Sequence, residues 1–451
     1  MLYWIIKPFL SIFLRIYYKY DYKGRNNIPY GKPVIFAPNH VNAFMDSIAI
    51  GVLTKQKIRF FARGDVFKKK LAKIILNDLS VSPVFRLQEG FSEIKKNDKT
   101  FEECRNRLAK NETILLFPEA ICIQERKLRP LKKGLSRIIF QTEEAFDFKK
   151  DVLVVPVGLN YTKAHKFRSK LFVDIGEPIS IKTYEQRYKQ DKVKAINEFT
   201  KELEQKLGEH MVILKNPEHE KLLEGIEEMY LHKWLKDKDH DVNDLEHSYS
   251  GSKEIAEMIN CLDEKDPQLT ISLREKTTHY LKCMRENNLR DHLLRPENIE
   301  RITIGSFILE YFIICLGLPF YLISLLVNYP PYLTAKKISD KKIKNIEFYA
   351  SVYGNLAMIL WGIYYGMQLL TIALIFHRWL LLGIYAVVVP LLGFYSLWFY
   401  TVKEKIFGRW RLLGMVRKKR ETIEQLIRER NIIIEEIEII KKEYLTTNFA
   451  K

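Results

Sequence analysis

The segment FAPNHVNAFMDS, residues 36–47, places a histidine six positions before an aspartate. A short apolar run precedes His40 and predicts a strand that ends before it, after which residues 43–52 can form a helix. On one continuous helix, six residues turn by about 600°, so the two side chains would face different directions. They can meet only if His40 lies in the loop and Asp46 lies in the first helical turn.

Together the two side chains could form a general base. An imidazole that is held by a carboxylate through one ring nitrogen can take a proton on its other nitrogen. Each residue also has a purely structural explanation. An aspartate such as Asp46 is favoured near helix starts by the helix dipole, and a single histidine such as His40 is common in loops. The pair alone therefore predicts catalysis only weakly.

Further charged residues follow apolar, strand-like runs elsewhere in the first half of the chain. Arg86 follows one run in the segment SPVFR, and Glu119 follows another in LLFPEA. The next segment, RKLRPLKKG, holds five cations: Arg126, Lys127, Arg129, Lys132 and Lys133. Ligands bind α/β sheets where loops converge at strand ends, so these groups could neutralise a phosphate dianion, with Arg86 as a fork-shaped donor. A charged loop can also be simply a solvated surface.

The elements that would position these side chains lie between residues 21 and 207. Strands are expected at Val34–Ala37, Ile58–Ala62, Val81–Phe85, Thr113–Phe117, Val152–Val157 and Leu171–Ile175. Helical patterns lie between most of them, at Val66–Leu76, Phe101–Ala109 and Leu135–Phe146. Strands that alternate with helices in this way predict an α/β domain with a mixed central sheet.

Several short motifs now occur in a fixed order over about residues 20–207: NH with a downstream Asp, PVFR, FPE followed by PLKKG, VPVG and GEPI. Together they resemble the glycerophospholipid acyltransferase (PlsC-type) family. The resemblance implies that His40 is the general base and that Asp46 is its orienting partner. It also implies that Arg86 anchors the phosphate of the acceptor and that Glu119 positions the acceptor.

The chain departs from the common pattern of that family at three places. Its histidine and aspartate follow H-x5-D rather than H-x4-D, which is similar to fungal-type glycerol-3-phosphate/dihydroxyacetone-phosphate acyltransferases. Ala120 replaces the usual Gly after FPE, and Cys122 replaces an Arg often found three residues after the Glu. Arg126 or Arg129, with Lys132 in the same loop, could supply the missing cation for substrate binding.

The resemblance implies an O-acyltransferase of phospholipid biosynthesis. Its donor would be acyl-CoA or acyl-carrier protein, and its acceptor glycerol 3-phosphate or 1-acylglycerol 3-phosphate. His40 would remove the proton of the acceptor hydroxyl as it attacks the thioester carbonyl, without a covalent acyl-enzyme. No bound cofactor is expected. The alternative is a non-catalytic membrane tether or lipid-transfer scaffold that retains the fold, which would not need the complete set of predicted site residues.

Composition limits the other function classes. The 451 residues hold 73 Lys and Arg against 55 Asp and Glu, a formal charge of +18. This excess suits an anionic membrane, a nucleic acid or a phosphorylated substrate, but no recognised nucleic-acid-binding motif is present. Neither C-x-x-C nor H-E-x-x-H spacing occurs, so no metal site is predicted. The cysteines are odd in number, which argues against a disulfide framework: Cys104, Cys122, Cys261, Cys283 and Cys315.

Long apolar stretches predict an integral membrane protein. Residues 348–376 and 379–402 contain no Lys, Arg, Asp or Glu, and each is longer than the roughly 20 residues that span a bilayer. They are expected to form a hairpin with His377-Arg378 at its tip. A third stretch, residues 302–333, is expected to enter and return on one side, bending near Gly317-Leu318-Pro319, because lysines follow it. The catalytic domain is expected on the cytoplasmic face, where thioester donors occur.

The remaining segments complete a five-part organisation. Residues 1–20 interleave cations with aromatic residues and are expected to form one or two interfacial membrane helices before the α/β acyltransferase domain of residues 21–207. Residues 208–301 are polar and predict a helical appendage, and residues 302–402 form the hydrophobic membrane region. Residues 403–451 repeat isoleucine and leucine at an approximate 3.5 spacing, interrupted at Arg430, which predicts an amphipathic helix or coiled coil and possible self-association.

Overall fold

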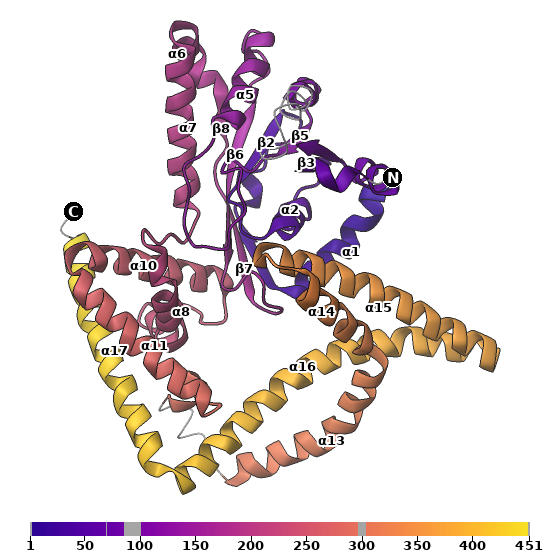
Figure 1. Ribbon diagram of the computed structural model, residues 1–451, viewed down its shortest axis with the longest axis vertical. Helices are drawn as coiled ribbons and strands as arrows, with labels where there is room; N and C mark the ends of the chain where they lie inside the picture. Colours follow the sequence, from indigo (N-terminus) through magenta and orange to yellow (C-terminus); the bar gives the residue numbers. More distant parts are fainter. Residues whose placement is uncertain (1, 69, 85–100, 296–303, 450–451) are drawn as a thin grey trace. The chain divides into compact units, whose positions relative to one another are not determined.

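The computed structural model describes residues 2–68, 70–84, 101–295 and 304–449 (Figure 1). The chain divides into two compact units. Unit 1 comprises residues 1–217, 241–253 and 345–351, and unit 2 comprises residues 218–240, 254–344 and 352–451. The predicted five-part division stays a prediction, since the two units divide the chain at other places.

Unit 1 is built on one mixed β-sheet. Its strands are β1 (Lys19–Lys23), β2 (Val34–Pro38), β3 (Ile58–Arg63), β4 (Val81–Val84), β5 (Thr113–Leu115), β6 (Leu153–Tyr161), β7 (Lys170–Ile175) and β8 (Ile179–Ser180). The described strands lie in the order β1-β7-β6-β2-β5-β3-β4, with β8 paired to β6. β2 is parallel to its neighbours β5 and β6, whereas β6 and β7 are antiparallel. The predicted mixed α/β sheet is therefore confirmed.

Helices cover both faces of this sheet. The helices of unit 1 before residue 217 are α1 (Leu2–Tyr17), α2 (Ala43–Gly51), α3 (Lys70–Asp78), α5 (Gly134–Ala145), α6 (Glu185–Gln190) and α7 (Lys192–Glu209), with a further helix over 101–109. Figure 1 shows α5 and α7 on one side of the central strands and α1 and α2 on the other. All five residues of β2 are buried, which is the pattern of a parallel strand with both faces covered.

Two strands were not predicted, and two predicted strands end more than one residue from the predicted position. β5 ends at Leu115, two residues before the predicted end at Phe117. β1, with the sequence KYDYK, was not expected, because three of its five residues are charged and it pairs only with β7, at the edge of the sheet. β8 has only two residues, too few for a sequence pattern. β6 continues four residues beyond the predicted end at Val157, and this extension carries Tyr161 to the candidate site.

Residues 241–253 belong to unit 1, although they lie within the predicted appendage. Tyr249, near the start of α10 (Leu245–Lys265), stacks on Phe172 of β7 with ring centroids 4.9 Å apart. Its hydroxyl also donates to the buried Asp174 at 3.2 Å. The start of α10 is therefore packed against β7 of the sheet.

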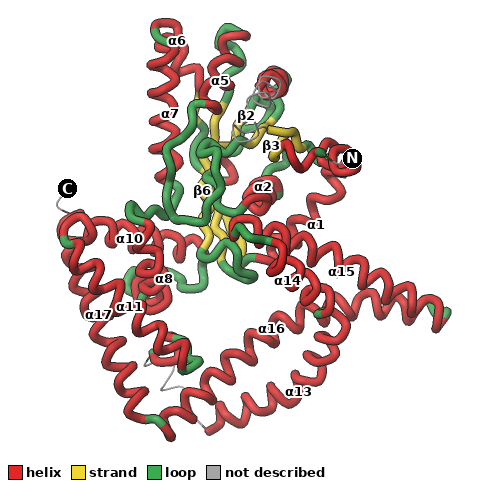
Figure 2. Tube along the Cα trace, in the orientation of Figure 1, coloured by secondary structure: helices red, strands yellow, loops and turns green. Residues whose placement is uncertain are grey.

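Unit 2 is helical in its described residues, as Figure 2 shows by the absence of yellow strand there. Besides the rest of α10, its polar helices are α8 (Glu220–Met229), α9 (Leu231–Lys236), α11 (Pro267–Glu286) and α17 (Arg420–Phe449). The apolar stripe of α17 is buried: Ile423, Leu426, Ile433, Ile437 and Ile440. Because α17 packs on α11 of the same chain, this stripe gives no support for self-association, which stays a prediction.

The interruption of that stripe at Arg430 has a structural explanation. Arg430 is 7% exposed, and its Nε donates to Oδ1 of Asp291 at 2.8 Å. Asp291 is fully buried and also accepts a hydrogen bond from the hydroxyl of Tyr280 at 2.9 Å. Arg430 therefore occupies a core-facing position of α17 because a buried carboxylate lies opposite it.

Three described helices are long and apolar enough to cross a membrane: α13 (Ile304–Asn328) over Phe307–Asn328, α15 (Ile346–Phe376) and α16 (Trp379–Lys418). The chain is therefore membrane-associated. α15 and α16 form the predicted hairpin, because the hydroxyl of Tyr365 donates to the carbonyl of Ala386 and that of Tyr385 to Gln368. His377 and Arg378 lie between the two helices.

The expectation that residues 302–333 enter and return on one side of the membrane, bending near Gly317-Leu318-Pro319, stays a prediction. α13 runs through Pro319 as one helix of 25 residues (Figure 1). It packs antiparallel to α16, with Ser324 donating to the carbonyl of Leu392 at 2.6 Å. Packing against a second helix keeps the helix continuous even though proline removes one backbone hydrogen bond. The lysine-rich segment after it forms helix α14 (Pro330–Lys342).

Helix α1 has two different faces. Tyr3, Leu14 and Tyr17 are buried, whereas Trp4 and Phe9 are 50% and 61% exposed. A helix with one packed face and one exposed aromatic face fits the interfacial role predicted for residues 1–20. Membrane contact of α1 stays a prediction.

Candidate active site

His40 and Asp46 meet as the sequence requires. β2 ends at Pro38 and α2 begins at Ala43, so His40 lies in the loop and Asp46 in the first turn of the helix. Nδ1 of His40 lies 2.9 Å from Oδ2 of Asp46. Because a carboxylate only accepts hydrogen bonds, Nδ1 carries the proton and Nε2 is left as the acceptor. The structure thus provides the geometry of a general base, while the catalytic roles stay predictions.

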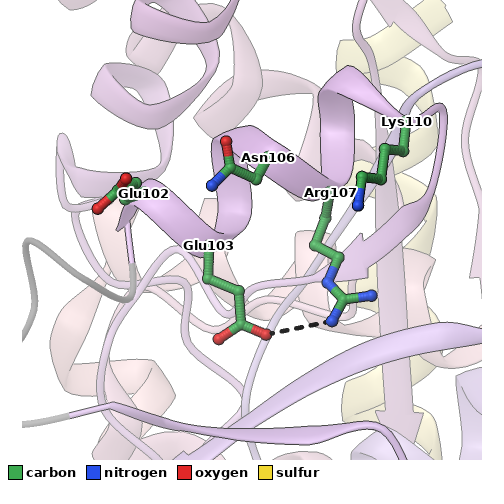
Figure 3. Close-up of a pocket in the computed structure, with 5 residues that line it drawn as sticks. All are labelled: Glu102, Glu103, Asn106, Arg107 and Lys110. Atoms are coloured by element: carbon green, nitrogen blue, oxygen red, sulfur yellow. Dashed lines mark ion pairs between the residues drawn. The ribbon is translucent and has the colours of Figure 1, made fainter.

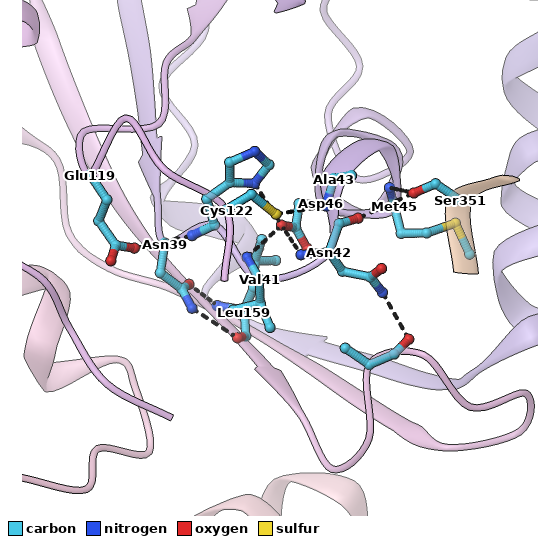
Figure 4. Close-up of polar contacts among 12 residues, drawn as sticks. Asn39, Val41, Asn42, Ala43, Met45, Asp46, Glu119, Cys122, Leu159 and Ser351 are labelled. Atoms are coloured by element: carbon cyan, nitrogen blue, oxygen red, sulfur yellow. Dashed lines mark hydrogen bonds and ion pairs between the residues drawn. The ribbon is translucent and has the colours of Figure 1, made fainter. Parts of the chain in front are cut away.

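Besides His40, three other groups donate hydrogen bonds to the carboxylate of Asp46. The backbone N–H groups of Val41 and Asn42 donate to Oδ2 at 2.8 and 2.7 Å (Figure 4). The hydroxyl of Tyr161 donates to Oδ1 at 2.8 Å. Asp46 is fully buried. Burial raises the pKa of Tyr161 well above its ordinary value, so this hydroxyl keeps its proton and remains a donor. Four donors fix the carboxylate that orients the imidazole.

The imidazole of His40 is also fixed by packing. Its ring stacks on Phe117 with centroids 3.7 Å apart and an interplanar angle of 15°. Phe117 follows β5, which is parallel to β2, so both loops leave the same edge of the sheet. The side chain of His40 is 15% exposed, which leaves part of the ring open to an incoming hydroxyl. The first residue of the FPE motif therefore supports the base.

Glu119 braces the same loops. Its Oε1 accepts from the backbone N–H of His40 at 3.1 Å, and its Oε2 accepts from the backbone N–H of Arg129 at 3.2 Å. Glu119 is 3% exposed, and this burial raises the pKa of its carboxyl above the ordinary value. These contacts link the His40 loop to the cationic loop. The predicted contact of Glu119 with the acceptor stays a prediction.

Sequence patterns missed several residues that shape the site. The side-chain amide of Asn39 exchanges two hydrogen bonds with the backbone of Leu159 at 2.7 and 3.1 Å, so it continues the pairing of β2 with β6. The hydroxyl of Ser351 donates to the carbonyl of Asn42 and accepts from the N–H of Met45, both at 3.3 Å. Polar residues that follow strand ends could have indicated Asn39 and Tyr161. No sequence signal could have indicated Ser351.

The cationic loop is only partly engaged. The guanidinium of Arg129 pairs with Glu125 at 2.6 Å, and that of Arg126 donates to the carbonyl of Thr162 at 3.4 Å. Lys132 is exposed. Arg86 lies outside the described residues. Substrate binding by Arg126, Arg129, Lys132 and Arg86 stays a prediction.

The backbone conformation of Ala120 shows why glycine is usual at this position in the family that the motifs resemble. Its φ is 58°, in the left-handed region, where glycine has no steric penalty and alanine does. The turn after Glu119 therefore requires the conformation for which the family commonly uses Gly. Cys122 follows this turn, and the N–H of Ala43 donates to its sulfur at 3.2 Å (Figure 4).

A separate cavity lies beside the helix over 101–109. It has a volume of about 490 Å³ and is lined by Glu102, Glu103, Asn106, Arg107 and Lys110 (Figure 3). Arg107 is paired with Glu103 at 3.7 Å and with Glu112 at 3.0 Å. None of the predicted site residues lines this cavity, so it does not compete with the His40 site as the place of the chemistry.

Known proteins are similar to the region that carries this site. Residues 19–160 match the family described as Acyltransferase. An uncharacterised acyltransferase of Schizosaccharomyces pombe is 34% identical over 93 residues, which cover 20% of this chain and 14% of that protein. Glycerol-3-phosphate O-acyltransferase 1 of Saccharomyces cerevisiae is 23% identical over 281 residues, 60% of this chain and 35% of that protein. The chain thus matches 35% or less of the length of these relatives.

A second yeast protein and one solved structure complete the comparison. Glycerol-3-phosphate O-acyltransferase 2 of Saccharomyces cerevisiae is 30% identical over 114 residues, 25% of this chain and 15% of that protein. The acyltransferase PlsC from Thermotoga maritima has 21% identity and a TM-score of 0.33 over 45% of this chain and 78% of its own, which supports no structural inference. The motifs, the match over residues 19–160 and the yeast relatives agree: this region is a domain of the acyltransferase family.

Proposed function

We propose that this protein transfers an acyl chain from a thioester donor to a hydroxyl group of a glycerol-phosphate acceptor. The observation that carries the proposal is the contact of His40 Nδ1 with the buried Asp46, which leaves Nε2 as a proton acceptor. The names of the two yeast relatives support glycerol 3-phosphate as the acceptor. 1-Acylglycerol 3-phosphate remains the second candidate, since it offers the same phosphate and a free hydroxyl.

The reaction follows from the geometry of the dyad. A neutral hydroxyl is a poor nucleophile, so Nε2 of His40 takes its proton as the oxygen attacks the thioester carbonyl. The imidazolium that forms is stabilised by Asp46 through the proton on Nδ1. Collapse of the tetrahedral intermediate expels the thiolate of coenzyme A or acyl-carrier protein, which receives the proton from His40. The ester and the thiol are the products.

The cationic loop supplies the binding site for the acceptor phosphate in this proposal. Lys132 is exposed, and Arg129 can exchange Glu125 for a phosphate, a stronger anionic partner of the planar guanidinium. Glu119 joins this loop to the backbone of His40, so a phosphate bound there lies within one connected structure with the base. Arg86 is proposed as a further phosphate ligand from its motif.

A panel of acceptors tests the proposal directly. The full-length protein, purified in detergent, is incubated with radiolabelled acyl-CoA or acyl-carrier protein and with glycerol 3-phosphate, 1-acylglycerol 3-phosphate or glycerol. We expect product with a phosphorylated acceptor and little with glycerol, because the phosphate anchors the substrate. Lys132→Ala should raise the KM for the acceptor and leave that for the donor unchanged. Absence of transfer to every acceptor would instead favour a membrane tether that retains the fold.

We infer the membrane topology from the composition of unit 1. Residues 241–253 and 345–351 both belong to the same compact unit as the catalytic sheet, and a folded unit of this kind lies on one side of the membrane. The chain between them must therefore cross the membrane an even number of times. Because α13 is the one candidate span among the described residues of that segment, it does not cross. α16, with 40 residues, is about 60 Å long, twice the thickness of a bilayer core of about 30 Å. α13 packs on α16 from Val389 to Arg409, so in this proposal it enters the bilayer beside the apolar part of α16 without crossing.

The proposed topology places unit 1 and α14 in the cytoplasm, with thioester donors, and the α15–α16 tip on the far side. Lys337 of α14 and His377 at the tip are both exposed and suit labelling. In intact cells or spheroplasts, an impermeant thiol reagent should modify His377→Cys but not Lys337→Cys, with the modified peptide identified by mass spectrometry. Labelling at position 337 from outside would contradict the topology.

A further inference from the structure

We propose that a thiophilic divalent metal ion, zinc in the first place, binds to His40, Asp46 and Cys122 and inhibits the enzyme. The metal site rests on geometry alone, whereas the inhibition rests on the proposed function. A ring nitrogen of His40, a carboxylate oxygen of Asp46 and the sulfur of Cys122 lie within 4.8 Å of one another. Among the described residues, no second group of three such side chains is this close. The sequence predicted no metal site, because Cys122 is 82 positions from His40.

The three side chains are a donor set that zinc prefers. Zinc binds cysteine sulfur at about 2.3 Å and histidine nitrogen or carboxylate oxygen at about 2.0–2.2 Å, in a tetrahedral arrangement. Tetrahedral ligands at these lengths lie about 3.3–3.6 Å from each other. His40 Nδ1 and Asp46 Oδ2, at 2.9 Å, need to separate by only a few tenths of an ångström. The remaining separations, at most 4.8 Å, close by rotation of the Cys122 side chain.

One contact of Cys122 favours the thiolate that binds metals, whereas the Asp46 carboxylate in the same group opposes this anion until a cation is bound between them. The N–H of Ala43, the first residue of α2, donates to its Sγ at 3.2 Å. A hydrogen-bond donor at a helix N-terminus stabilises a thiolate, and the thiolate is the metal ligand. Cys122 and His40 are both partly exposed, so an ion can reach them and water can complete its coordination.

A metal ion bound to either ring nitrogen of His40 would stop catalysis. A metal on Nε2 removes the proton acceptor, and a metal on Nδ1 replaces the proton through which Asp46 orients the ring. Magnesium prefers oxygen ligands in an octahedral arrangement, so it should not bind this set. Selective inhibition by zinc is therefore the signature of the site.

A second cysteine and histidine supply a matched control. Cys283 Sγ lies 3.5 Å from His279 Nε2 on α11, and no third potential ligand is grouped with them among the described residues. A two-ligand site binds zinc more weakly than a three-ligand site of the same donors. Cys283→Ala therefore removes a thiol next to an imidazole without touching the proposed site.

The test uses the full-length protein in detergent and two readouts. Acyl transfer is measured over a series of buffered free zinc concentrations for the native chain, Cys122→Ala, Cys122→Ser and Cys283→Ala, each relative to its own zinc-free rate. Cadmium binding is followed separately through the ultraviolet absorption of its thiolate complex, which requires no catalysis.

We expect zinc to inhibit the native chain reversibly, with recovery after chelation, while millimolar magnesium has no effect. Loss of one protein ligand should raise the zinc concentration for half-inhibition by at least about tenfold in both Cys122 variants, but not in Cys283→Ala. The cadmium signal should disappear in the Cys122 variants only. Equal zinc sensitivity of native and Cys122 chains, or loss of the cadmium signal in Cys283→Ala, would overturn the proposal. A cadmium signal that depends on Cys122 in a chain without acyltransferase activity would preserve the metal site and reject the proposed function.

Discussion

Replacing Asp46 with asparagine separates the charge of this residue from its shape. The carboxylate accepts three hydrogen bonds on Oδ2, from His40 and the backbone of Val41 and Asn42, and one on Oδ1, from Tyr161. An asparagine can keep the first three with its carbonyl oxygen. Its NH2 group then faces the hydroxyl of Tyr161, which can rotate to accept. The tautomer of His40 is therefore preserved, and mainly the negative charge is lost.

The expected loss of kcat follows from the negative charge that Asp46→Asn removes. When His40 takes a proton in the transition state, the imidazolium and the Asp46 carboxylate are unit charges about 4 Å apart, which is worth about 4 kcal/mol at an effective dielectric constant of about 20. At 1.36 kcal/mol per factor of ten, Asp46→Asn should lower kcat roughly a thousandfold. The KM for the acceptor should change little, because the cationic loop is untouched.

The assay is steady-state acyl transfer with thermal unfolding as a check on folding. Asp151→Asn is the matched control, because this carboxylate pairs with Lys32 at 3.0 Å, before the start of β2, away from the loop that holds His40. It should keep kcat within about threefold of the native value. A folded Asp46→Asn variant with a kcat within about threefold of the native enzyme would refute the reasoning.

Three further predictions follow from other contacts. Tyr161→Phe should lower kcat about tenfold, since one buried donor to Asp46 is worth about 1–3 kcal/mol. The control Tyr20→Phe loses a hydroxyl bonded to the carbonyl of Ala49 and should keep the native kcat. Equal losses of kcat in the two variants would place the effect in folding. Burial raises the folded-state pKa of Glu119, so its contribution to stability is fully present below about pH 4 and is lost as pH rises through the raised pKa. The Tm difference between the native protein and Glu119→Gln should therefore fall as pH rises over that range. A constant Tm difference would contradict this prediction. Arg430→Met should lower the free energy of unfolding by up to about 3–5 kcal/mol, because it leaves the buried Asp291 with only the more distant Arg295, at 3.8 Å, as a cationic partner. Adding Asp291→Asn should restore part of the loss, and full stability of Arg430→Met would show that the pair is not coupled.

The sequence predicted those parts of the site that depend on local order. Strands of a parallel sheet end at one edge, so His40 after β2 and Glu119 after β5 could be placed together from the apolar runs that precede them. The meeting of His40 with Asp46 followed from helix geometry alone. These inferences needed only residues close in the sequence and the rule that parallel strands share an edge.

The other contacts depend on packing between residues far apart in the sequence, and no sequence pattern indicated them. Tyr161 reaches Asp46 from 115 positions away because β6 continues past its apolar run, and Ser351 reaches Met45 from 306 positions away. α13 continues as a helix through Pro319, and it packs along α16, which lies more than 50 positions later in the sequence. Arg430 looked like a break in an apolar stripe because its partner, Asp291, lies 139 positions earlier.

The central claim is that His40 is the general base of acyl transfer. The most direct measurement is kcat for transfer to glycerol 3-phosphate by purified His40→Ala, alongside His279→Ala, which removes an exposed histidine from α11. Loss of general-base catalysis should lower kcat by about 10²- to 10⁴-fold in His40→Ala, while thermal unfolding and the His279→Ala rate stay at native values. A folded His40→Ala enzyme that retains a kcat within about threefold of the native value would contradict the claim.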